Sequence, residues 1–154
     1  MDIFRHGKSY ILFLILHFFA FVLSLTVIGL YAQDIQRARE AGKHSDPKWV
    51  FAVVVGALSA VTALIYFVPF VLRFAVVPIW NTILFVLWIA VFGVFGAMYI
   101  HEDPEGDGGI KRMKDAVWID LANAVMWLIL ALTAFVYWWG HRERHSRFTG
   151  RAKV

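Results

Sequence analysis

Four long apolar stretches limit what this chain can fold into. They cover residues 9–32, 49–72, 76–100 and 116–139. Each is long enough for a helix to cross about 30 Å of bilayer hydrocarbon. The composition agrees, since 60% of the residues are hydrophobic, 17% are charged and the mean hydropathy is +0.66. The sequence therefore predicts an all-α integral membrane protein, an antiparallel four-helix transmembrane bundle that forms a single domain over residues 1–154.

An even number of spans places both termini on the same side of the membrane. The terminal side carries eight Lys and Arg residues and two carboxylates, a net charge of +6. The two long loops together carry seven Lys and Arg residues and eight carboxylates, a net charge of −1. Because cytoplasmic segments are enriched in Lys and Arg, we expect cytoplasmic termini, with residues 140–154 as a basic C-terminal tail. We interpret the first span as a retained signal anchor, and expect a multi-pass protein of the plasma membrane or the secretory pathway.

Polar side chains open the last span. Arg112 and Lys114 lie at the membrane boundary, and Asp120 and Asn123 follow within the apolar run. A carboxylate about 7 Å inside a span must find a partner or a proton. Since Asp120 and Asn123 are three residues apart, they share one helix face, which we expect to point at protein and to make structural or partner contacts.

The partner of Asp120 should come from the same end of the bundle. The candidate donors there are Tyr31, Gln33, Tyr99 and His101. His17, another structural or partner-contact candidate, should lie about 10 Å from Asp120 along the membrane normal. We interpret it as a hydrogen-bonded interior histidine, with a proton relay or a ligand role as the alternative.

Small residues at spacings of four predict where the helices pack closely, because close backbone approach is a main source of helix association in lipid. The pairs are Gly56 with Ala60 in the second span and Gly93 with Ala97 in the third, where Gly96 lies beside them. We expect these positions to join helices within one chain, with a homo-oligomer as the alternative use. Trp88 and Trp127 lie in the middle of spans, so at least one should pack inside the bundle.

No pattern typical of a cofactor, metal or catalytic site stands out. The chain has no cysteine, and it contains no zinc-protease motif, nucleophile elbow or phosphate loop. The loop over residues 101–115 follows a calcium-loop pattern at Asp103, Glu105, Asp107, Gly108 and Ile110, but Lys114 stands where a bidentate glutamate is needed. We therefore expect no enzyme activity, no cofactor, no metal and no nucleic-acid partner, and four spans without an inverted repeat argue against a transporter.

Two segments resemble a known family. Val27-Ile28-Gly29-Leu30-Tyr31 closes the first span, and Arg112-Met113-Lys114-x-Ala116-x-Trp118-x-Asp120-Leu121-x-Asn123 opens the last. With four spans, this pattern resembles the MARVEL domain in its fungal version, over residues 5–139. The resemblance implies a membrane protein of vesicle trafficking, membrane apposition or lipid-rich lateral domains, alongside physins, occludin and myelin-and-lymphocyte proteins. The absence of loop cysteines and of a long cytoplasmic domain argues against tight-junction and signalling-adaptor roles.

The function that we expect is a non-enzymatic organiser of membrane microdomains or of vesicle trafficking, acting through lateral contacts with lipids and other integral membrane proteins. One alternative is an accessory subunit of a larger membrane complex, such as a pump, a transporter or a cell-wall synthase. Another is an ion- or proton-conducting oligomer that uses Asp120.

Overall fold

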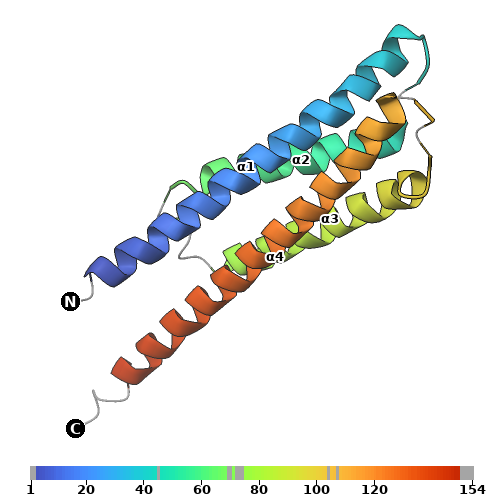
Figure 1. Ribbon diagram of the computed structural model, residues 1–154. Helices are drawn as coiled ribbons and strands as arrows, with labels where there is room; N and C mark the ends of the chain where they lie inside the picture. The colour runs from blue at the N-terminus through green and yellow to red at the C-terminus, as the bar shows by residue number, and fades with distance from the viewer. Residues whose placement is uncertain are drawn as a thin grey trace.

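The protein is a bundle of four long helices (Figure 1). A computed structural model describes residues 3–44, 46–68, 71, 75–103, 105–106 and 108–149, with side chains described between residues 11 and 140 of these. The helices are α1 (Ile3–Glu40), α2 (Pro47–Ile65), α3 (Val76–Tyr99) and α4 (Gly108–Thr149), and no strand occurs among the described residues. Each helix contains a segment long and apolar enough to cross a membrane, so the prediction of a multi-pass integral membrane protein is confirmed.

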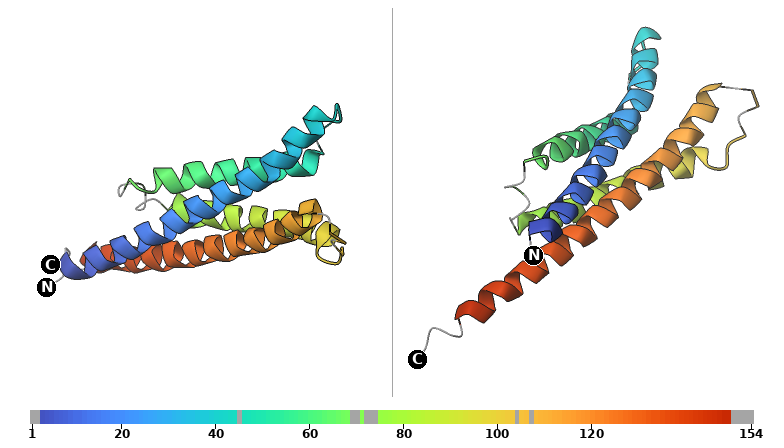
Figure 2. Two further views of the ribbon diagram at one scale, coloured as in Figure 1. Left: turned by 45° about the horizontal axis from the view of Figure 1, so that its top comes forward. Right: turned by 60° about the vertical axis from the view of Figure 1, so that its left-hand side comes forward.

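The helices alternate in direction, and they pack mainly as two hairpins (Figures 1 and 2). α1 lies against α2, α3 lies against α4, and α1 also contacts α4 along the bundle. The start of α1 and the end of α4 lie at one end of the bundle, the terminal end. The α1–α2 and α3–α4 connections lie at the other end, the loop end. The antiparallel bundle and the placement of both termini on one side are therefore as predicted.

Local sequence explains how α2 begins and where it ends. The Asp46 side chain accepts a hydrogen bond from the backbone N–H of Lys48 at 2.9 Å, and Pro47 occupies the first helical position. α2 ends at Ile65, so the predicted span over residues 49–72 is too long at its end. Pro69, which has no backbone N–H, argues against continuing the helix, although Pro69 itself lies outside the described residues.

α4 is longer than predicted at both ends. It begins at Gly108 instead of near residue 116, so Arg112 and Lys114 stand on the helix and the preceding loop is shorter than expected. At the other end the helix continues past Trp139 to Thr149. The first part of the predicted basic tail is therefore helical, and residues 150–154 lie outside the described part.

Candidate functional site

Polar side chains are concentrated where α1 and α4 face each other, and we call this region the α1–α4 polar interface. It comprises His17, Ser24, Tyr31 and Asp34 from α1 and Arg112, Asp120 and Asn123 from α4. His17, Ser24 and Tyr31 are seven residues apart, almost two helical turns, and all three are buried. This spacing is the sequence signal that marks the inward face of α1.

A short hydrogen bond joins Tyr31 of α1 to Asp120 of α4. The Tyr31 hydroxyl donates a hydrogen bond to Oδ2 of Asp120 at 2.6 Å, and both side chains are fully buried. Oδ1 of Asp120 has no hydrogen-bond partner among the described residues. Of the four candidate donors, Tyr31 is the one that reaches the carboxylate, because it lies on the α1 face that packs on α4.

Asn123 is buried one turn further along α4 and contacts α1 more weakly. Its amide donates to the Ile119 carbonyl at 3.1 Å, and its Oδ1 lies 3.5 Å from the Ser24 hydroxyl. That hydroxyl also lies 2.8 Å from the Ala20 carbonyl, a better acceptor by distance. Each side chain is thus bonded mainly to its own helix, and the Ser24–Asn123 contact is chiefly one of packing.

An ion pair between Asp34 and Arg112 lies at the loop end of the α1–α4 polar interface. The Arg112 guanidinium donates to Oδ1 of Asp34, and Arg37 lies 3.9 Å from the same oxygen. The Asp34 and Arg112 side chains are 13% and 19% exposed, so this pair is only partly shielded from its surroundings. Sequence reasoning identified Arg112 but missed Asp34. In antiparallel helices, a contact between Tyr31 and Asp120 also brings Asp34 near Arg112, because Asp34 follows Tyr31 by one turn and Arg112 precedes Asp120 by about two turns.

Lys114 and His17 lie apart from these contacts. Lys114 donates to the Glu102 carbonyl at 2.8 Å, which ties the start of α4 to the loop before it. Nδ1 of His17 lies 2.8 Å from the Phe13 carbonyl oxygen, and its ring packs on those of Tyr66 and Trp127. His17 and Asp120 therefore belong to different parts of the α1–α4 polar interface.

Buried polar side chains on α2 and α3 join the rest of the bundle. The Trp88 indole donates to Ser59 at 2.8 Å, and the Trp80 indole donates to Thr62 at 3.0 Å, so two indoles connect α3 to α2. Asn81 donates to the Leu130 carbonyl at 3.1 Å and connects α3 to α4. Sequence reasoning did not assign Asn81 a role, although an amide inside an apolar span is a signal for an interhelical contact.

The small residues divide into packed and exposed positions. Gly56 and Ala60 are buried, and a Cβ added to Gly56 would lie 2.8 Å from Cγ1 of Ile28 and 3.4 Å from the Ser24 carbonyl. On α3, Gly93 and Ala97 are exposed and a Cβ at Gly93 would meet nothing within 4 Å. The prediction of intrachain packing at Gly93 and Ala97 is wrong. The inward position is Gly96, where an added Cβ would lie 3.8 Å from Val117.

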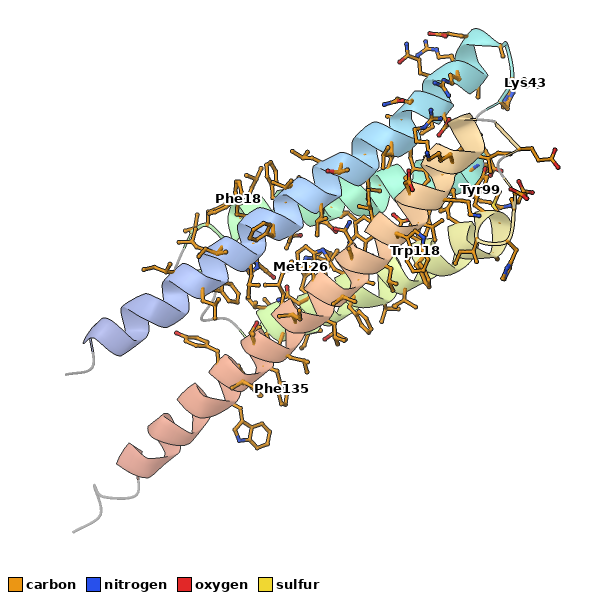
Figure 3. All side chains as sticks on the ribbon, in the orientation of Figure 1. Phe18, Lys43, Tyr99, Trp118, Met126 and Phe135 are labelled. Carbon is orange, nitrogen blue, oxygen red and sulfur yellow. The ribbon has the colours of Figure 1, made fainter. Side chains whose placement is uncertain are left out.

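This arrangement of buried polar side chains connects the helices to one another. Among the described residues, no cluster of three or more His, Cys, Asp or Glu side chains could hold a metal, and Asp107 of the calcium-loop pattern lies outside them. The outward faces of the helices are apolar, as Phe18 and Phe135 illustrate (Figure 3). The buried polar side chains therefore lie in contacts between helices, while many large apolar side chains lie on the outward faces.

Comparison of the chain with known protein families, with curated proteins and with solved structures gives no match.

Proposed function

We propose that this chain is a non-enzymatic tetraspan membrane protein that organises membrane microdomains or supports vesicle trafficking through lateral contacts with lipids and other membrane proteins. The proposal includes its membership of the MARVEL family, on the resemblance of the segment from Arg112 to Asn123. It also includes cytoplasmic termini in the plasma membrane or a secretory-pathway membrane, on the distribution of Lys and Arg.

The observation that supports this proposal best is the separation of polar and apolar side chains. Asp120, Asn123 and His17 are buried within the bundle. The outward side chains are large and apolar on all four helices, for example Ile11, Ile15, Phe18, Leu25, Val54, Val61, Ile79, Val86, Leu132 and Phe135. A protein with this surface interacts with its surroundings chiefly through lipid-facing contacts, and this is what a lateral organiser requires.

Partition between lipid phases tests this function. The purified chain is reconstituted into giant vesicles of zwitterionic lipids and sterol in which ordered and disordered phases coexist. We expect unequal partition, altered by Phe18→Ala and Phe19→Ala together, because both side chains face outward. The inward variant Asp120→Asn serves as the control and should partition like the wild type. Equal partition of the wild type between the phases would contradict microdomain organisation.

A second candidate function is that of an accessory subunit in a larger membrane complex. The exposed positions Gly93 and Ala97 favour it, since they lie one turn apart on an α3 face that no described part of this chain covers. Small residues on a lipid-facing helix allow another helix to approach closely. Blue native electrophoresis in mild detergent tests this candidate. A high-mass band that Gly93→Leu removes without lowering the melting temperature supports it, and a wild type that migrates as a monomer contradicts it.

A further inference from the structure

Charges are arranged differently at the two ends of the bundle. At the loop end, Asp34 contacts both Arg112 and Arg37, and Lys114 bonds the Glu102 carbonyl. At the terminal end, the helical segments at residues 3–8 of α1 and 141–149 of α4 contain five Lys and Arg residues and one carboxylate, Glu143. The cations are Arg5, Lys8, Arg142, Arg144 and Arg147. Within these segments, one carboxylate cannot neutralise five cations, so the terminal end carries excess positive charge.

The aromatic residues of α4 indicate where this charge lies relative to the bilayer. The Phe135 ring lies 6.3 Å from that of Trp138 and 5.8 Å from that of Trp139, and Val136 is 70% exposed. Indole rings prefer the headgroup level of a membrane. In the sequence, the apolar run gives way to charged residues after Gly140. α4 continues there as a helix beyond the ends of α2 and α3 (Figures 1 and 2).

The basic part of α4 therefore begins at the headgroup layer. Nine residues, 141–149, rise by about 13 Å along a helix axis. Arg142, Arg144 and Arg147 thus stand within about 10 Å of the lipid phosphates, which is close to one Debye length at physiological ionic strength. α1 begins at the same end of the bundle, which adds Arg5 and Lys8 to the same layer.

We propose that the terminal end of the bundle, formed by residues 3–8 of α1 and 141–149 of α4, is a docking surface for the headgroups of anionic phospholipids. Four of its five cations are arginines, whose planar guanidinium matches the geometry of phosphate oxygens. The inference rests on the proposed function in that it names the class of lipid for the lateral contacts, although its charge argument requires only a membrane-spanning bundle.

The test measures lipid preference around the reconstituted full chain. Vesicles have the same composition in both leaflets, so the orientation of the chain does not matter. Energy transfer from the tryptophans to acyl-labelled phosphatidylserine or phosphatidylcholine reports the relative association of each lipid. One variant replaces Arg5, Lys8, Arg142, Arg144 and Arg147 by Gln. The matched control replaces five loop-end cations by Gln: Arg37, Arg39, Lys43, Lys48 and Lys111.

We expect the wild type to prefer phosphatidylserine by more than about fivefold at physiological salt. The terminal variant should lose at least about fivefold of that preference, because each basic residue near an anionic surface contributes about fivefold. The loop-end control should keep it. Raising the salt to 1 M should abolish the preference of the unaltered protein, a result that does not depend on how any variant folds.

Three results would overturn the docking surface. The wild type could associate equally with both lipids, or the loop-end control could lose as much preference as the terminal variant. Inorganic phosphate at constant ionic strength could remove the preference for phosphatidylserine, which would mean that the basic surface binds free phosphate and not lipid headgroups. The phase-partition test of the proposed function uses zwitterionic lipids, so the two ideas can fail separately.

Discussion

The interfaces that α1 makes with α4 and with α2 are stabilised in different ways. Toward α4, α1 presents polar side chains, and Tyr31 bonds Asp120 while Asp34 pairs with Arg112. Toward α2, the close approach occurs at Gly56, which leaves no room for a Cβ beside Ile28. In lipid, where apolar surfaces gain little by leaving the solvent, both hydrogen bonds and close packing can hold helices together.

The difference teaches which kind of change each interface tolerates. A polar contact is directional, so removing one partner leaves the other buried without its hydrogen bond. A close-packed contact depends on volume, so it tolerates a change of polarity better than an added methyl or methylene group. The two interfaces should therefore respond to different classes of substitution.

The largest effect should come from added volume at the α1–α2 interface. Gly56→Leu should lower the stability of the bundle by about 3 kcal/mol, because the new side chain overlaps Ile28 and approaches the Ser24 carbonyl. Thermal unfolding in detergent measures the change. Gly93→Leu is the matched control, since an added Cβ there meets nothing within 4 Å, and it should leave stability unchanged. Equal destabilisation by both variants would refute the close packing at Gly56.

At the α1–α4 interface, Asp120→Ala should cost about 1–2 kcal/mol, because it leaves the Tyr31 hydroxyl buried without its acceptor. Tyr31→Phe, combined with Asp120→Ala in a double-mutant cycle, should show a coupling of about 1 kcal/mol. Additive losses in the cycle would mean that the 2.6 Å hydrogen bond contributes nothing specific. An unchanged melting temperature for Asp120→Ala, with loss of a co-purifying protein, would instead indicate a partner site.

Arg112→Gln should destabilise the bundle by about 1 kcal/mol, since the pair with Asp34 lies near the membrane boundary and is partly open to water. Lys111→Gln is the neighbouring control, because Lys111 is exposed on the same helix and should tolerate the change. Unfolding of the wild type and of both variants at low and high salt measures these effects. If Lys111→Gln lowered the stability as much as Arg112→Gln does, the effect would come from the net charge of the protein and not from the contact with Asp34.

The smallest effect should come from Ser24→Ala, at most about 0.5 kcal/mol. The Ser24 hydroxyl lies 2.8 Å from the Ala20 carbonyl of its own helix, and its 3.5 Å contact with Asn123 is long. The same unfolding assay compares it with Tyr31→Phe, which removes a hydroxyl two turns further along the same face. If Ser24→Ala lowered the free energy of unfolding as much as Tyr31→Phe does, polar side chains along the whole interface, and not mainly Tyr31, would stabilise the bundle.

The number and type of the helices could be predicted from the sequence more fully than the contacts between them. Long apolar runs are sufficient to identify four spans, because nothing but a helix or a closed barrel satisfies the backbone in lipid. Tyr31 could be placed among the donors for Asp120 because alternating spans bring the same ends together. The family resemblance and the cytoplasmic termini remain predictions.

Contacts that depend on the rotation of a helix about its axis were harder to predict. Gly93, Gly96 and Ala97 are nearly adjacent on α3, and only packing against α4 decides that Gly96 faces inward. The Asp34–Arg112 pair likewise becomes predictable only when the register between α1 and α4 is known, and the Tyr31–Asp120 contact supplies that register. Helix ends were also missed, since the polar residues from Gly108 to Asp115 continue a helix outside the apolar run.

The unequal lengths of α2 and α3 bear on bilayer thickness. At 1.5 Å per residue, the 19 residues of α2 reach about 28 Å and the 24 residues of α3 reach about 36 Å. The hydrocarbon layer is about 27 Å thick in the endoplasmic reticulum and about 32 Å in the plasma membrane. A thin bilayer matches α2 and makes α3 tilt, whereas a thick one suits α3 and must thin locally beside α2. A bilayer of either thickness therefore fits one of these two helices better than the other.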